Sequence, residues 1–178
     1  MWQYQEVNMG YFTCFIIFRN IYLKKDMEQK IIAAGMLAIC PETGRYLILK
    51  RRNDVKYPGY WGLPGGFLDE EDGYPKITAI REFKEETKYK GLIKLSKEPL
   101  FVEKSNHLDF YFYVGILPYE FVPDLQGECK CSPESLDYKW IELDCKNDNI
   151  IPTIISTIEL KRDLIEKVIN KFKNKNYE

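Results

Sequence analysis

The sequence contains little that could form a transition-metal site. It has one histidine, His107, and five cysteines, an odd number without a Cys-x2-Cys pair; the closest spacing is Cys129-x-Cys131. Because structural zinc sites take four His or Cys ligands at short, regular spacings, we do not expect one here. The same cysteine usage favours reduced thiols and therefore a cytoplasmic protein.

An excess of charge of one sign is also lacking. The 178 residues have a net charge of −1, although 30% of them are charged, so no overall field attracts nucleic acid. The apolar run at residues 11–18 is too short to cross a bilayer, and no basic segment precedes it, so we expect neither a signal peptide nor a membrane partner. The length suits one domain. We interpret residues 1–28 as an N-terminal extension and residues 29–178 as a single domain.

The order of apolar patterns is that of an α+β protein. Continuous or alternating apolar runs predict strands, and apolar residues at helical spacing predict helices. The predicted elements are strands at residues 31–40, 46–49, 108–117 and 138–143, a turn at residues 41–44, a glycine turn at residues 64–66, a helix from Pro75 to about Tyr89 and an amphipathic helix over residues 153–173.

Three glutamates share one face of the helix that begins at Pro75. Glu82, Glu85 and Glu86 stand at i, i+3 and i+4, and at 3.6 residues per turn they form one stripe. Carboxylates at such short distances repel each other unless a positive charge lies over them. A divalent cation such as Mg²⁺, which takes oxygen ligands, would supply that charge.

The segment from Gly66 to Tyr89 resembles the box of the Nudix hydrolase family, G-x5-E-x7-R-E-U-x-E-E-x-G-U, in which U is apolar. Residues 81–86, Arg-Glu-Phe-Lys-Glu-Glu, fit its central part. Two departures are visible: the loop has one extra residue, and Lys88 stands where the family has a glycine that ends the helix. Gly91 is then a candidate for the left-handed residue beyond the helix.

The extra residue leaves the loop acid open. Counting from Gly66 places Asp72 at the acidic position, whereas counting back from Arg81 places Gly73 there. Glu70, Glu71 and Asp72 are therefore all candidates.

The resemblance implies a fold and a chemistry. The fold is a mixed sheet between helices, an α/β/α sandwich, and the chemistry is Mg²⁺- or Mn²⁺-dependent cleavage of a nucleoside diphosphate joined to another group. By position, the metal ligands are Glu82, Glu85 and Glu86, the catalytic residues include Glu82 and Glu85, Arg81 orients the glutamates, and Gly65 and Gly66 let the backbone pass close to the phosphates.

The general base and the substrate contacts are less determined. The base is a glutamate of the box or a later acid, with Glu134 the first choice and Glu128 the second. Arg51 and Arg52 are candidates for phosphate contacts. Tyr57, Tyr60 and Trp61 are candidates for stacking on a base, although core packing explains Trp61 equally well.

We expect a small nucleotide as partner, namely ADP-ribose, a nucleotide sugar or a nucleoside triphosphate, and a monomer or homodimer. Two alternatives remain. A hydrolase of capped RNA would need a basic groove for the RNA. The candidates to line such a groove are Lys161, Arg162, Lys171, Lys173 and Lys175. A Nudix-fold module that binds nucleotides without turnover is the other.

Overall fold

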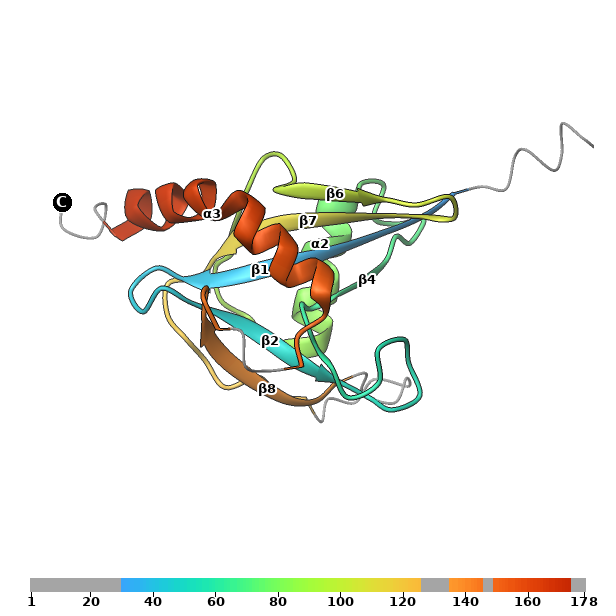
Figure 1. Cartoon of the computed structure of the whole chain (residues 1–178), viewed down its shortest axis with the longest axis horizontal. Coiled ribbons are helices and arrows are strands. Elements are labelled where there is room, and N and C mark those ends of the chain that lie inside the picture. The colour runs from blue at the N-terminus through green and yellow to red at the C-terminus, as the bar shows by residue number, and fades with distance from the viewer. Residues whose placement is uncertain (1–29, 126–134, 146–148, 174–178) are drawn as a thin grey trace, which may run out of the picture. The chain divides into compact units, whose positions relative to one another are not determined.

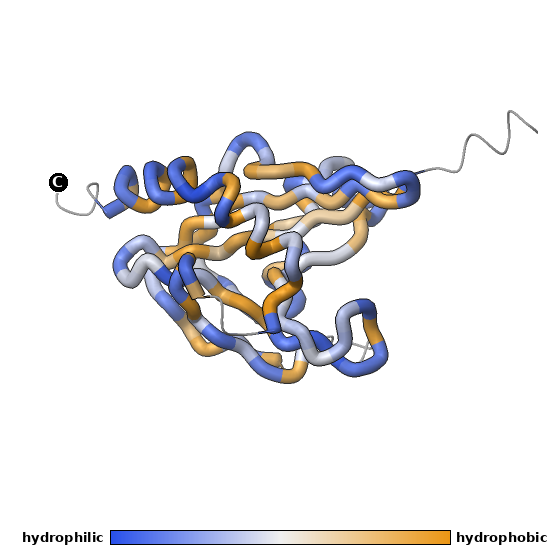
Figure 2. Tube along the Cα trace, viewed as in Figure 1, coloured by the Kyte–Doolittle hydropathy of each residue, from blue (hydrophilic) through white to orange (hydrophobic). Residues whose placement is uncertain are grey.

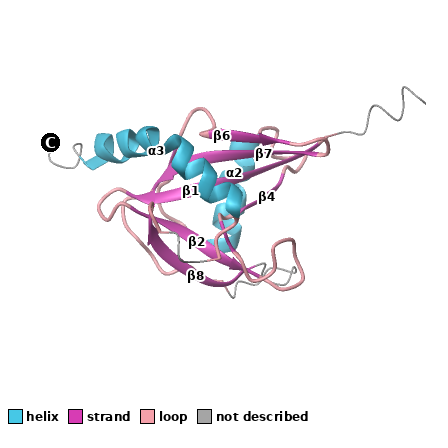
Figure 3. Ribbon diagram, in the orientation of Figure 1, coloured by secondary structure: helices cyan, strands magenta, loops and turns pink. Residues whose placement is uncertain are grey.

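One mixed sheet is the centre of the fold (Figure 1, Figure 3). The computed structural model describes residues 30–125, 135–145 and 149–173, and those from Ile31 onward belong to one compact unit. In chain order the elements are β1 (Ile31–Cys40), β2 (Arg45–Arg51), β3 (Trp61–Gly62), β4 (Gly65–Phe67), α2 (Pro75–Thr87), β5 (Lys94–Leu95), β6 (Phe101–Lys104), β7 (Leu108–Ile116), β8 (Ser135–Glu142) and α3 (Pro152–Lys173). The predicted α+β order is confirmed.

Strand β1 changes its partner halfway along its length. On one side it runs parallel to β7 throughout. On the other side Ala33–Gly35 pair with β4, whereas only Ile39 and Cys40 pair with β2. The sheet therefore opens between β4 and β2, and Figure 1 shows β2 and β8 diverging from β1 and β7.

The apolar run of β1 is continuous because both faces of the strand are covered. Leu37 and Ile39 belong to the core cluster that contains the isoleucines of α3. Met36 and Ala38 point to the opposite face, where they join Phe83 of α2. Figure 1 shows α3 in front of the sheet and α2 behind it, and in Figure 2 the hydrophobic colour concentrates on the strands between them. The sandwich that the resemblance implies is confirmed.

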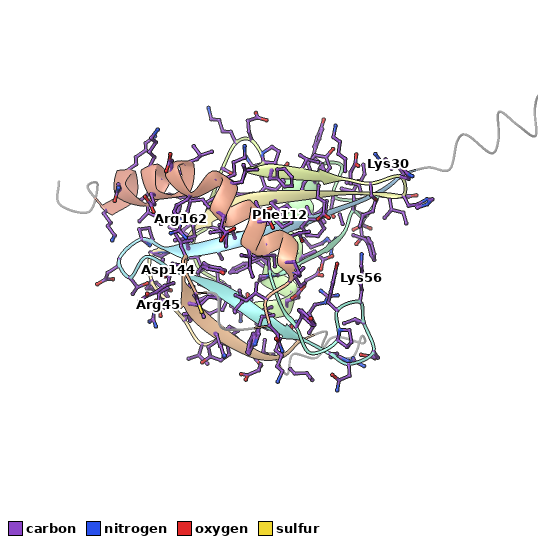
Figure 4. All side chains as sticks on the ribbon, in the orientation of Figure 1. Lys30, Arg45, Lys56, Phe112, Asp144 and Arg162 are labelled. Carbon is purple, nitrogen blue, oxygen red and sulfur yellow. The ribbon has the colours of Figure 1, made fainter. Side chains whose placement is uncertain are left out.

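Helix α3 covers the front face as its apolar spacing predicts. Ile154, Ile158, Ile165 and Ile169 are buried at helical intervals, and Figure 4 shows Phe112 beneath the helix. Arg162, a candidate for RNA contact, donates to the carbonyl oxygen of Leu143 at 2.9 Å. In the part of the chain that the structure describes, neither helix is long and apolar enough to span a membrane.

Helix α2 begins at Pro75, as predicted, and ends at Thr87. Proline suits this position because the first amide of a helix has no intrahelical partner. The capping residue after the helix is Lys88, with φ 55° and ψ 23°. Its amide donates to the carbonyl oxygen of Lys84 at 2.8 Å. The expectation that Gly91 supplies the left-handed residue is therefore wrong.

Candidate active site

Gly65 and Gly66 form strand β4 rather than the predicted turn. A Cβ atom on Gly65 would lie 2.4 Å from the carbonyl oxygen of Ala34, and one on Gly66 would lie 2.5 Å from Cδ of Glu82. Both contacts are shorter than any real Cβ contact. At Gly65 the neighbour is backbone, so only glycine lets β4 lie this close to β1. At Gly66 the neighbour is the end of the Glu82 side chain, which a Cβ atom would displace. Within the protein the close approach is to its own strand and carboxylate; the expected approach of this backbone to phosphates stays a prediction.

Arg81 gathers the acidic side chains of the box. Its Nη1 atom donates to Glu82 at 2.7 Å and to Glu85 at 3.1 Å. Its Nε and Nη2 atoms bond to the carboxylate of Asp72, and Nη2 also donates to the carbonyl oxygen of Phe67 at 2.9 Å. Hydrogen bonding to Asp72 is the main cause that raises the pKa of Arg81 above its usual range, so the guanidinium stays charged.

Of the three candidates for the loop acid, Asp72 is the one that bonds to Arg81 in the described structure. Its side chain is 3% exposed and also accepts hydrogen bonds from the hydroxyl of Thr78 at 2.9 Å and the amide of Asp69 at 3.2 Å. The hydrogen bonds from Arg81 outweigh the effect of burial and lower the pKa of Asp72 to about 2. The other two candidates, Glu70 and Glu71, are exposed.

The three helix glutamates have different surroundings. Glu82 is 16% exposed in its side chain and lies against Gly66, whereas Glu85 is 56% exposed. Glu86 accepts a hydrogen bond from the amide of Gly65 at 3.1 Å and one from the hydroxyl of Ser135 at 3.5 Å. The stripe thus faces β4 and the start of β8, next to the opening between β4 and β2.

The donor chemistry of this stripe fits a hard divalent cation, because every side-chain donor is a carboxylate oxygen. Glycine at position 66 also leaves room for the Glu82 carboxylate against the strand. Across residues 30–125, 135–145 and 149–173, however, no three His, Cys, Asp or Glu side chains converge closely enough to hold a metal ion. A bound cation would therefore need the carboxylates to turn toward it.

The predicted substrate contacts Arg51, Arg52 and Trp61 each interact with other groups of the protein. Arg51 donates to the carbonyl oxygen of Lys56 at 2.8 Å, and Arg52 pairs with Asp54. Trp61 is 7% exposed within the main core cluster, and the ammonium of Lys139 lies 4.6 Å from its ring centroid. This burial agrees with the core-packing explanation of Trp61, and its stacking on a base stays a prediction.

Two predicted acids and the cysteine pair lie outside the described residues, namely Glu128, Glu134, Cys129 and Cys131. Sequence reasoning in turn missed three hydrogen-bond partners of the site. They are Thr78, which donates to Asp72, Ser135, which donates to Glu86, and the carbonyl group of Phe67, which accepts from Arg81. Thr78 carries a usable signal, because it precedes Arg81 by three residues and so shares its helical face. Ser135 and Phe67 carry none, since their contacts depend on how the strands meet.

Comparisons with known proteins give the same fold. "Putative hydrolase 111R" of Invertebrate iridescent virus 3 is 30% identical over 116 residues, which are 65% of this chain and 60% of that protein. The NUDIX domain of NrtR from Shewanella oneidensis, solved with ADP ribose, has a TM-score of 0.61 at 20% identity over 82% of this chain and 97% of its own. A bifunctional NMN adenylyltransferase/ADP ribose pyrophosphatase from Francisella tularensis, solved with AMP and a manganese ion, has a TM-score of 0.53 at 21% identity over 84% of this chain and 46% of its own.

The matched segment contains the whole box. A family model for the NUDIX domain matches residues 29–147, more than half of the chain. This range includes β4, the acidic loop and α2, whose contacts are described above. The chain therefore belongs to the NUDIX domain family.

Proposed function

We propose that this protein is a metal-dependent pyrophosphohydrolase, which cleaves the diphosphate linkage of a nucleoside diphosphate joined to another group. The observation that carries the proposal is the set of bonds from Arg81 to Asp72, Glu82 and Glu85. These bonds hold the acidic parts of the box together despite the extra loop residue. Similar folds solved with ADP ribose, or with AMP and manganese, support a small nucleotide as substrate and a divalent metal as cofactor.

In this proposal Glu82, Glu85 and Glu86 hold Mg²⁺ or Mn²⁺, which when bound would neutralise the diphosphate charge and acidify a water. Arg81 restricts the rotamers of Glu82 and Glu85 from one side of the stripe, as groups behind metal ligands commonly do. The amide of Gly65 orients Glu86 from the other side. A glutamate of the box, or Glu134, accepts the proton of the attacking water.

A panel of nucleotides with Mg²⁺ or Mn²⁺ tests the proposal. The panel contains ADP-ribose, a nucleotide sugar and nucleoside triphosphates, and product identification reports which phosphate bond breaks. We expect turnover of at least one member. The variant Glu86→Gln should lower kcat by at least about a hundredfold. Replacing a residue that only hydrogen-bonds to a metal ligand already costs about 10- to 100-fold in metal affinity or activity.

The matched control is Glu166→Gln, which removes an exposed glutamate of α3 and should leave turnover unchanged. Wild-type protein that hydrolyses no member of the panel, or a Glu86→Gln variant as active as wild type, would overturn the proposal. Nucleotide binding without any product would point instead to a binding module. A steep loss of RNA binding with salt, together with release of a cap, would point to a cap hydrolase.

A further inference from the structure

The loop between β2 and β3, residues 52–60, carries two tyrosines that the proposed mechanism does not use. Tyr57 is 37% exposed and Tyr60 is 36% exposed. Their ring centroids lie 5.9 Å apart with the planes tilted by 56°, and the ammonium of Lys56 lies 5.3 Å from the Tyr57 centroid. The loop thus places two aromatic rings and one positive charge together at the surface.

The backbone holds this pair in an unusual conformation. Tyr57 has φ 58°, a left-handed value that is uncommon for a bulky residue and that clusters at functional sites. The amide of Tyr60 donates to the carbonyl oxygen of Tyr57 at 3.2 Å. The guanidinium of Arg51 donates to the carbonyl oxygen of Lys56 at 2.8 Å. The two rings are therefore held at a defined place by both ends of the loop.

The same loop is anchored beside the glutamate stripe. The amide of Arg51 donates to the carbonyl oxygen of Tyr60 at 2.8 Å, and Arg51 pairs with Ser135 across β2 and β8. The hydroxyl of Ser135 in turn reaches Glu86 at 3.5 Å. Figure 1 shows the loop extending beyond the end of β2, and Figure 4 places Lys56 on it. One residue on each strand thus connects the tyrosine pair to the box.

We propose that Tyr57 and Tyr60 bind the base of the substrate by stacking. Aromatic side chains accept any base in this way, because every base has a π-face, and a nearby cation adds to the attraction. The inference rests on the proposed function and narrows it to diphosphates that carry a base, with Lys56 supplying positive charge toward the phosphates. Trp61 is buried in the core, so the two tyrosines are the exposed rings of this segment.

Steady-state kinetics of the full chain test the inference. The substrates are the best nucleotide from the panel and 5-phosphoribosyl 1-diphosphate, which has no base. Each of Tyr57→Ala and Tyr60→Ala should raise KM for the nucleotide about tenfold with kcat nearly unchanged, as expected from the strength of base stacking on a ring. The Tyr57→Phe and Tyr60→Phe variants keep the rings and should behave like wild type.

The matched control is Tyr119→Ala, which removes another exposed tyrosine, on the segment after β7, and should leave KM unchanged. A Tyr57→Ala/Tyr60→Ala double variant with the wild-type KM, or equal use of the base-free diphosphate by wild type, would overturn the inference while the proposed function stands. If wild type hydrolyses nothing, the proposed function fails. Equilibrium binding of adenosine diphosphate then decides the inference: weaker binding by the double variant supports it, and equal binding overturns it.

Discussion

The bond between Asp72 and Arg81 makes the stability of the fold depend on pH in a defined range. Folding lowers the pKa of Asp72 from 3.8 to about 2, so the unfolded chain binds a proton at this position more readily than the folded chain does. The resulting stabilisation is fully present above about pH 4, the unfolded pKa, and is lost as the pH falls toward 2. The substitution that removes it is Asp72→Asn.

The size of the effect follows from the shift and from exposure. A shift from 3.8 to about 2 corresponds to about 2.4 kcal/mol. The guanidinium of Arg81 is 24% exposed, and solvent on its side screens the pair, so we expect about 1–2 kcal/mol. This is the amount by which the difference in unfolding free energy between wild type and Asp72→Asn should shrink between pH 6 and pH 2.

Urea unfolding at pH 6, 4, 3 and 2, followed by tryptophan fluorescence, measures this difference. The comparison of two proteins at each pH cancels the titration of the other carboxyl groups. The control is Asp54→Asn, which removes a carboxylate that is 60% exposed and also pairs with an arginine; surface pairs contribute little, so its difference should stay flat. A difference for Asp72→Asn that is equally flat from pH 6 to pH 2 would refute the reasoning.

Three further predictions concern the backbone and the core. Gly65→Ala places a Cβ atom against the backbone of Ala34 and should lower the free energy of unfolding by about 1–3 kcal/mol. Gly66→Ala meets only the end of the Glu82 side chain, so it should keep stability but, by displacing that carboxylate, lower turnover about a hundredfold. Equal stability losses in urea would contradict this contrast. Lys88→Gly relieves a left-handed lysine and should raise stability by about 0.5–1 kcal/mol, so a lower Tm would count against it. Ile165→Ala empties a fully buried position of α3 and should cost about 2–5 kcal/mol in urea; a loss under about 1 kcal/mol would mean that the helix does not pack as described.

The long elements of the fold follow from the sequence because their apolar patterns are unambiguous. The run at residues 31–40 matches β1 residue for residue, and the isoleucines of α3 repeat at helical spacing. The short strand β4 could not be predicted. Two of its three residues are glycines, which are depleted in strands. The strand pairs with β1 only because glycine at position 65 permits an approach that a side chain would block.

The end of α2 shows why a local rule can fail. Glycine is the usual residue in a left-handed position after a helix, which favoured Gly91. The helix instead stops at Thr87, and Lys88 takes the left-handed conformation. Tyr89 then turns inward, where it is 6% exposed and its ring packs 4.5 Å from that of Phe121. The burial of an aromatic ring, worth more than the backbone cost of one left-handed lysine, explains where the helix ends.

The position of the extra loop residue is the part of the site that only three-dimensional contacts could supply. Both counts along the box are arithmetically valid, but only Asp72 is buried against Arg81. With Asp72 as the loop acid, the insertion falls between it and Arg81. Gly73 follows Asp72 with φ 69° and open space at its Cβ position, so a positive-φ glycine takes up the added length before Pro75 begins the helix. The bonds from Arg81 to the acids thus favour an insertion on the helix side of the loop, away from β4.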